Sequence, residues 1–248
     1  MTRQSDRDRG QSDNDRPDYH RDTPTLDEFD GELDAIGRAF TLKDERRTGW
    51  QLRGIERPES VAAHSWGVAF LCLVFADRMA EEFAERGESL DVDRAIRLAI
   101  VHDLPEAETG DYPTRADPDA ETIPPELKAT REQAAIDRFA ETLDRGQTIA
   151  EAWERYEARD DPAAVFVKEM DLIDMCLQAL YYEADGRYDP EEFEGEAYER
   201  LEEFFVTARP RLRTGLGRSL FEEIYGRYRS LVDVDPVAAD NQYDESDS

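Results

Sequence analysis

Histidine, cysteine and lysine are scarce in this 248-residue sequence, and each shortage limits what the chain can do. The two cysteines, Cys72 and Cys176, each lie in an apolar helical pattern, where a buried reduced thiol is commoner than a disulfide or a nucleophile. No run reaches the roughly 18 uncharged apolar residues of a membrane span, and the N-terminus has no apolar signal-peptide core. We therefore expect a cytoplasmic protein without a membrane partner.

Positive charge is also in short supply. Sixty Asp and Glu residues outnumber 31 Lys and Arg, which gives a formal net charge of −29. This excess repels nucleic-acid backbones, so we expect no nucleic-acid partner. Residues 1–24 and 232–248 together carry −7, which leaves −22 on the rest of the chain.

An acidic body of this kind repels itself in dilute salt, and salt near 1 M screens the repulsion over about 3 Å. Only three of the 31 cations are lysine. We interpret the composition as that of a salt-adapted, halophilic protein. The alternative is an acidic partner-binding surface, which would normally gather its acids in one block.

The order of apolar and polar segments predicts one all-α domain, residues 25–235, between two disordered tails, residues 1–24 and 236–248. Apolar residues recur at intervals of three and four, and no alternating strand pattern is present. A helix that opens at Ser60 is apolar nearly all round, which predicts a central, buried helix. We expect helices over residues 26–40, 60–79, 93–104, 125–143, 149–158, 163–185, 190–207 and 216–232.

Two of the three histidines lie in the predicted folded body. A lone histidine on a helix, such as His64, is more often a hydrogen-bonded core or surface residue than a ligand. His102 differs because it stands beside Asp103 at the end of an apolar helix, where an unpartnered acid is costly. A borderline divalent cation would remove that cost. Local spacing alone does not bring these side chains together.

A second acid, Asp171, interrupts another apolar helix. It is a candidate for a further metal ligand, and pairing with Lys168 or an arginine is an equally good interpretation of its position.

The order of His64, His102-Asp103 and Asp171 resembles the HD-domain metal-dependent phosphohydrolases. The sequence motifs around these residues are similar to those of the 5'-deoxynucleotidase branch of that family. The likeness covers about residues 26–186 and consists of several motifs in order. These are Arg47-Thr48-Gly49-Trp50, the segment from Arg57 to Trp66, the segment from Leu98 to Ala107, Thr109-Gly110-Asp111, and the segment from Lys168 to Tyr182.

The resemblance implies a domain that is an HD-domain helical bundle with one divalent metal ion per chain, one of Mn, Co, Mg, Fe, Ni or Zn. A single ion is implied because dinuclear HD enzymes draw on further histidines, which this body does not have. The resemblance also implies a homodimer. The implied metal ligands are His64, His102, Asp103 and Asp171.

The resemblance further implies that Glu106 and Asp111 support catalysis, although a first-turn acid and an ordinary turn former are the simpler interpretations. It places Arg47 and Trp50 where the substrate is contacted, with Lys168 as a nearby cation. A solvated arginine and a core tryptophan are the alternatives.

Three positions depart from the family pattern. Ala63 stands where an acid often precedes the first metal histidine, and Leu172 stands where many relatives have lysine. Pro105 would clash with the carbonyl of Val101 in a continuous helix, so we expect the helix to stop near Leu104 and to restart, which re-aims Glu106.

The favoured function is hydrolysis of (deoxy)ribonucleoside 5'-monophosphates to nucleoside and phosphate. The rivals are an HD hydrolase of a nucleoside triphosphate or signalling nucleotide and a catalytically silent sensor that binds nucleotide or metal. A cluster of four arginines, Arg209, Arg211, Arg213 and Arg218, suggests another anion site, but pairing with surface acids is the commoner arrangement.

Overall fold

The computed structural model describes residues 30–113, 123–194 and 197–232. The chain divides into two units, Met1–Asp30 and Gly31–Ser248, and every contact given below lies within the second. The predicted tails, residues 1–24 and 236–248, lie outside the described residues, as does the start of the first predicted helix.

Across the described ranges the chain is helical and contains no β-strand, which confirms the predicted all-α class. An isolated antiparallel bridge joins Arg46 to Ser60. The α-helices are α1 (Asp30–Phe40), α2 (Thr48–Leu52), α3 (Val61–Glu85), α4 (Val92–Val101), α5 (Glu106–Thr109), α6 (Pro125–Thr142), α7 (Gly146–Ala158), α8 (Pro162–Ala184), α9 (Glu202–Ala208) and α10 (Gly215–Leu231); short 3-10 turns cover Thr41–Lys43, Pro190–Phe193 and Arg209–Arg211.

Three long helices begin at side-chain caps, which fixes where each enters the bundle. The Ser60 hydroxyl accepts a hydrogen bond from the backbone N–H of Ala63 at 3.2 Å, as expected for the predicted cap of α3. Asp91 caps α4 and Asp161 caps α8 in the same way. Residue Pro162 occupies the first position of α8, where its missing N–H costs nothing.

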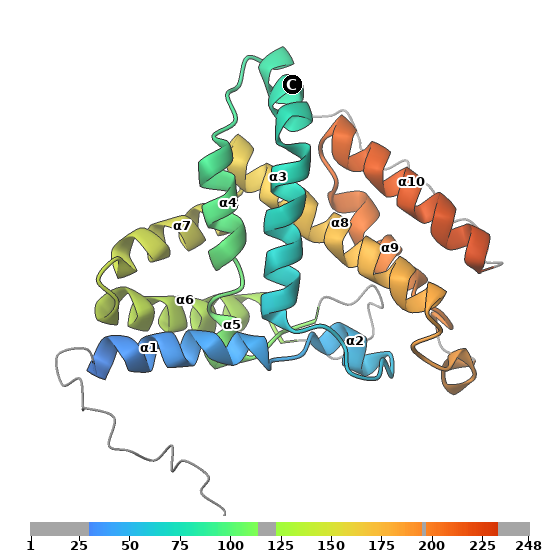
Figure 1. The fold of residues 1–248 in the computed structure, drawn as a ribbon, viewed down its shortest axis with the longest axis horizontal. Coiled ribbons are helices and arrows are strands. Elements are labelled where there is room, and N and C mark those ends of the chain that lie inside the picture. Colours follow the sequence, from blue (N-terminus) through green and yellow to red (C-terminus); the bar gives the residue numbers. More distant parts are fainter. Residues whose placement is uncertain (1–29, 114–122, 195–196, 233–248) are drawn as a thin grey trace, which may run out of the picture. The chain divides into compact units, whose positions relative to one another are not determined.

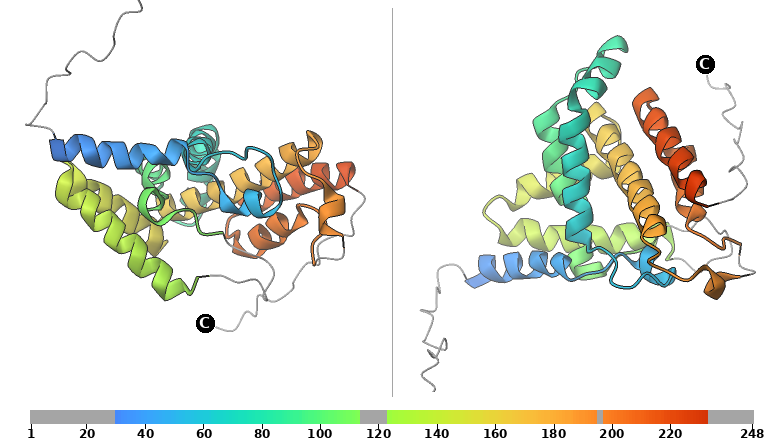
Figure 2. Two further views of the ribbon diagram at one scale, coloured as in Figure 1. Left: turned by 90° about the horizontal axis from the view of Figure 1, so that it is seen from below. Right: turned by 45° about the vertical axis from the view of Figure 1, so that its right-hand side comes forward.

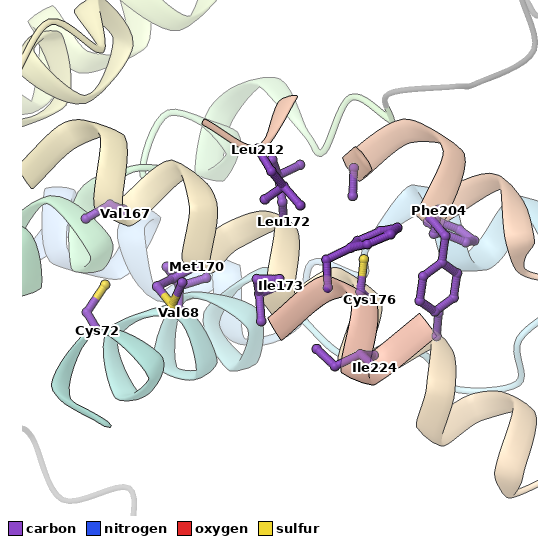
Figure 3. Close-up of a cluster of buried hydrophobic side chains, with 14 of the residues drawn as sticks. Val68, Cys72, Val167, Met170, Leu172, Ile173, Cys176, Phe204, Leu212 and Ile224 are labelled. Carbon is purple, nitrogen blue, oxygen red and sulfur yellow. The ribbon is translucent and has the colours of Figure 1, made fainter. Parts of the chain in front are cut away.

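The main hydrophobic core lies between α3 and α8 and continues toward α10 (Figures 1 and 3). In Figure 3, Val68 of α3 lies against Met170 of α8, and Cys72 lies near Val167 one layer further along. Each fully buried apolar side chain of this kind contributes roughly 1.5–3 kcal/mol. Both cysteines are free and buried, as predicted, and burial raises the pKa of Cys72 to about 12.

Two further layers support this core. Helix α10 runs alongside α8, as Figures 1 and 2 both show, and it contributes Phe221, Tyr225 and Tyr228 to an aromatic group around Phe205 of α9. Helices α6 and α7 pack on each other, and α7 also packs on α4 and α8. The bundle therefore holds the ends of α4 and α7 beside the middle of α8.

The prediction of one helix over residues 190–207 is wrong. The structure has a 3-10 turn at Pro190–Phe193 and then the short helix α9, with irregular backbone over residues 197–201. The guanidinium of Arg53, which is buried, donates to the carbonyl oxygens of Tyr198 and Arg200 at 2.7 and 2.8 Å. Those carbonyls are satisfied from outside the segment, so the backbone there does not need helical hydrogen bonds.

The prediction that α3 is buried all round is also wrong. Its outer face leaves Trp66, Phe70, Leu73 and Val74 about half or more exposed, and the centroids of the stacked Trp66 and Phe70 rings lie 5.3 Å apart. By length and composition α3 could also cross a membrane, a test that central bundle helices pass as well. The sequence showed that both faces of α3 are apolar, but it could not show which face the bundle covers.

Candidate metal centre and its pocket

The four predicted metal ligands meet at one buried place, contributed by α3, the end of α4 and the middle of α8. His64 Nε2 lies 3.2 Å from Asp171 Oδ1 and 3.4 Å from His102 Nε2. His102 Nε2 lies 3.2 Å from Asp103 Oδ2. The ligand atoms of His64, His102 and Asp103 all lie within 4.8 Å of one another, a grouping that could hold a metal ion.

Both histidines are oriented by a hydrogen bond on their other ring nitrogen. His64 Nδ1 lies 2.7 Å from Asp174 Oδ2, and His102 Nδ1 lies 2.8 Å from the carbonyl oxygen of Ala99. An acceptor at Nδ1 holds the proton on that atom and leaves the Nε2 lone pair for a cation. Two imidazoles and two carboxylates arranged in this way are a donor set that suits a borderline divalent ion.

The second aspartate is held from three sides. Asp171 Oδ2 accepts a hydrogen bond from Lys168 Nζ at 2.6 Å and one from the Tyr156 hydroxyl at 3.0 Å. Burial acts in the opposite direction, but Lys168 and the contact with His64 together lower the pKa of Asp171 well below its ordinary value. The carboxylate is therefore ionised, with Oδ1 facing the histidines. Lys168 sits where the sequence predicted a nearby cation, but it is already paired.

Arg47 ties two acids together across the pocket. Its Nη1 lies 3.2 Å from Asp103 Oδ2 and 3.1 Å from Asp111 Oδ1. Asp111 Oδ2 also accepts from the backbone N–H of Thr48, and the Thr48 hydroxyl donates to the Asp111 carbonyl oxygen at 2.9 Å. Burial would lower the pKa of Arg47, but these acids raise it well above its ordinary value. Both oxygens of Asp111 thus position the Arg47–Thr48 segment.

Glu106 is the acid without a fixed partner. Helix α4 ends at Val101 and α5 starts at Glu106, so the break expected at Pro105 is confirmed. The Glu106 side chain is buried, and its Oε2 has no hydrogen-bond partner among the described residues. Burial, with the charges of Asp103 and Asp111, raises the pKa of Glu106 well above its ordinary value. A buried carboxyl of this kind is suited to proton transfer.

Trp50 lines the same pocket, but its ring is occupied by packing. It is 2% exposed, its Nε1 donates to Glu59 Oε1 at 3.0 Å, and it packs on Phe204 and Tyr182. This environment favours the core interpretation over contact with a sugar or base.

Three residues around the centre were missed by sequence reasoning. Asp174 follows Asp171 by one helical turn, so an acid on the same face of α8 was a usable signal. Tyr156 and Glu59 lie on separate elements of the fold. No local sequence pattern indicates that Tyr156 contacts Asp171 or that Glu59 contacts Trp50.

The pocket that contains these residues encloses about 110 Å³. Its charged lining has five cations and seven acids. They are Arg47, Lys128, Arg159, Lys168, Arg211, Glu59, Asp103, Glu106, Asp111, Glu132, Glu157 and Asp171.

A helical bundle whose central helices aim two histidines and two aspartates at one another defines a helical metal-binding domain of the kind used for hydrolysis. The family model described as the HD domain matches residues 39–213, and the chain belongs to the HD-domain family. This membership confirms the resemblance seen in the sequence.

Relatives with assigned names agree with the family. The chain is 38% identical over 144 residues to the human protein named 5'-deoxynucleotidase HDDC2, covering 57% of this chain and 63% of that protein. It is 35% identical to the Danio rerio protein of the same name, covering 73% and 82%. The chain thus spans under two thirds of the length of the human relative.

Solved structures share the fold. A Pyrococcus horikoshii protein of known crystal structure is 30% identical, with a TM-score of 0.57, covering 79% of this chain and 98% of that one. A Magnetospirillum magnetotacticum protein described as a predicted metal-dependent phosphohydrolase is 23% identical, with a TM-score of 0.53, covering 81% and 97%, which is a likeness of fold alone.

Proposed function

We propose that the chain is a metal-dependent phosphomonoesterase that hydrolyses (deoxy)ribonucleoside 5'-monophosphates to nucleoside and phosphate. The observation that carries this proposal is the convergence of His64, His102, Asp103 and Asp171 beside the unpartnered carboxyl of Glu106. The similarity to proteins named 5'-deoxynucleotidase supports the substrate class.

One divalent ion per chain, one of Mn, Co, Mg, Fe, Ni or Zn, is held in this proposal by those two histidines and two aspartates. The fit rests on the two Nε2 atoms that face Asp103 and Asp171 while Asp174 and a backbone carbonyl hold the two Nδ1 atoms. When bound, the cation supplies Lewis-acid stabilisation of the charge on the phosphoryl group.

In the reaction, a water oxygen forms a bond to phosphorus, the bond from phosphorus to the 5'-oxygen breaks, and a proton passes to the departing nucleoside. We assign the proton transfer to Glu106, whose pKa is raised by burial and by neighbouring acids. Asp111 acts by holding Arg47 beside Asp103. The pocket is buried and narrow, which limits competing water.

The test is phosphate release from a panel of ribo- and deoxyribonucleoside 5'-monophosphates with each of several divalent metals, alongside nucleoside triphosphates. Monophosphate hydrolysis that requires the metal supports the proposal. Release from triphosphates alone would favour the rival hydrolase of triphosphates or signalling nucleotides, and no release from any nucleotide despite nucleotide binding would favour the silent sensor.

We also propose that the chain acts in the cytoplasm as a homodimer, joined through the outer stripe of α3. Trp66, Phe70, Leu73 and Val74 expose on the order of 400 Å² of apolar surface, taking about 150–250 Å² for a large side chain. That is roughly half of the ~800 Å² each partner gives to a standard interface. A helical stripe can meet its own copy about a two-fold axis.

Light-scattering mass tests the dimer. Trp66→Glu should halve the mass, whereas Leu231→Glu, at a similarly exposed apolar position on α10, should leave it unchanged. A monomeric parent chain would overturn the proposal.

A further inference from the structure

A second cavity of about 720 Å³ adjoins the metal pocket. The metal pocket is smaller than the roughly 300–1,000 Å³ of typical ligand sites, and the second cavity falls within that range. The two share Lys128, Arg159, Lys168 and Arg211 in their lining, and the second adds Arg213, Val165, Glu169 and Pro210. The space beyond the metal pocket is therefore lined mainly by cations.

Among the described residues, the second cavity has one acid in its lining, Glu169, and that acid is already hydrogen-bonded. Glu169 Oε1 accepts hydrogen bonds from the backbone N–H groups of Arg213 and Thr214, and its Oε2 accepts one from the Thr214 hydroxyl. The carboxylate thus fixes the start of α10, and its single charge offsets only one of the cations in the lining.

In a chain with a net charge of −29, the five cations and one acid of the described lining reverse the general balance. Two of the five, Lys128 and Lys168, pair with Glu132 and Asp171 outside this lining, so the three arginines carry most of the excess.

Two of the arginines that line the cavity, Arg159 and Arg211, have little or no acidic charge paired with them. Arg211 forms no ion pair within the part of the chain that the structure describes, and the ion pair recorded for Arg159 is to Glu157 at 4.0 Å. Burial and then the charge of Arg159 lower the pKa of Arg211. An anion near both guanidinium groups would relieve this repulsion and offer bidentate hydrogen bonds.

Of the rest of the arginine cluster, Arg209 pairs with a surface acid as the sequence predicted, and Arg218 bonds to backbone instead. Arg209 pairs with Glu222 at 3.1 Å and lies over the rings of Phe221 and Tyr225, and Arg218 donates to the Leu212 carbonyl oxygen. The structure therefore separates Arg211 and Arg213 from two neighbours that have structural partners.

The chemistry of the lining favours a phosphate over the nucleoside part of a substrate. Within residues 30–113, 123–194 and 197–232, no aromatic ring lines the second cavity and its apolar lining is Val165 and Pro210, so it offers a base little to stack on. A phosphomonoester group at the metal would be linked through its sugar to any further phosphate, which would then be a 2'- or 3'-phosphate.

We propose that this cavity is a second phosphate subsite, which binds a phosphate group in addition to the one hydrolysed at the metal, so that the chain prefers nucleotides with a further phosphate on the sugar. The proposal of a sugar-linked phosphate rests on the proposed function. The same chemistry could be met by a free phosphate ion, and the two sources can be separated.

The experiment is titration calorimetry on the metal-loaded full chain with a pair of non-hydrolysable probes, a nucleoside 5'-phosphonate and the same compound with a 3'-phosphate. The 3'-phosphate should tighten binding by at least about tenfold, as charge-assisted hydrogen bonds would give. Arg211→Gln should remove most of that gain and Arg211→Lys should restore part of it. Arg227→Gln, an exposed arginine of α10, should leave it intact. Thermal midpoints verify that each variant is folded.

A third titration adds inorganic phosphate with the 5'-phosphonate. Tighter binding of the phosphonate in its presence identifies a free ion as the occupant, and the absence of this effect together with the 3'-phosphate gain identifies the sugar-linked group. Equal affinities for both probes, with no effect of phosphate, would overturn the subsite. These are binding measurements, so a chain that fails to hydrolyse monophosphates but discriminates the probes would refute the proposed function and retain the subsite.

Discussion

The acids of the metal pocket and the acids of the outer surface differ in how they are held. Asp103, Asp111 and Asp171 each have a named cationic partner within 3.2 Å, and their burial makes each contact specific. On the outer surface, pairs such as Glu223 with Arg227 are about two-thirds exposed, where a single ion pair contributes about 0–1 kcal/mol. Each pocket acid therefore has its own effect on metal binding or catalysis, whereas the surface acids affect stability through their total charge.

The largest effect should come from removing a pocket ligand. Asp171→Ala or His102→Ala should reduce bound metal from about one ion per chain to a small fraction, because a four-ligand site loses one donor. Metal analysis of the purified protein measures this. Asp93→Ala, an exposed acid on α4, is the matched control and should keep its metal. Full retention of metal in both ligand variants would refute the assignment.

Next in size is the loss of turnover when the acids beside the ligands are removed. Glu106→Ala should lower kcat by about 10²–10⁴, the usual range for a lost acid–base group, while metal content persists. Asp111→Ala should also lower kcat with metal retained, because Arg47 loses the carboxylate that holds it beside Asp103. Parent rates with nucleoside monophosphates in both variants would show that the proposed roles are wrong.

A smaller effect concerns stability. The raised pKa of Glu106 means that the folded, metal-free state disfavours the ionised carboxylate. The contribution of Glu106 to the free energy of unfolding is therefore complete below about pH 4.3 and is lost as pH rises through the raised pKa. In Glu106→Gln the side chain keeps its size and shape but cannot ionise, so the variant does not lose stability as pH rises. It should stabilise the metal-free chain at neutral pH by about 1–3 kcal/mol, a rise of several degrees in Tm.

Calorimetry at several pH values measures the Glu106 effect. The gain should shrink toward pH 4. A Glu106→Gln chain that is less stable than the parent at pH 7 would contradict the argument.

The smallest effect per residue belongs to the surface. Screening of −22 charges should raise Tm as KCl or NaCl increases from about 0.1 M to about 2 M, where the Debye length falls to about 3 Å or below. A neutral osmolyte at matched concentration controls for stronger apolar burial, and metal is held constant because ligand binding also raises Tm. A flat or falling Tm would leave the acidity to be explained by a partner-binding surface.

The parts that could be predicted from the sequence are those that depend on local pattern. Ser60 caps α3 as expected, and the helix breaks before Pro105 as expected, although α4 ends at Val101, three residues before the predicted end. The convergence of His64 with Asp171 was available only by resemblance, because about a hundred residues separate them and no local rule joins the two helices.

Other parts depend on which surfaces meet. From the sequence, substrate contact and core packing are equally good interpretations of Trp50. The structure decides between them because Phe204, far along the chain, packs on the Trp50 ring. Likewise, Arg211 has the same local sequence signal as Arg209, and the two differ because residues of α10, an acid and two aromatic rings, contact Arg209. Residues 190–207 carried a helical pattern, but the side chain of Arg53 takes carbonyls within that segment.

Because lysine is scarce, chemical labelling of lysine can report whether the metal pocket is occupied. Apart from the N-terminus, an amine-reactive mass tag has three targets in the chain, and two of them, Lys128 and Lys168, line the metal pocket. Lys43 is exposed and is not among the described residues of that lining, so it serves as an internal reference in every spectrum. The ratio of adducts at the two pocket lysines to adducts at Lys43 would therefore follow occupancy of the site, without any label being engineered into the protein.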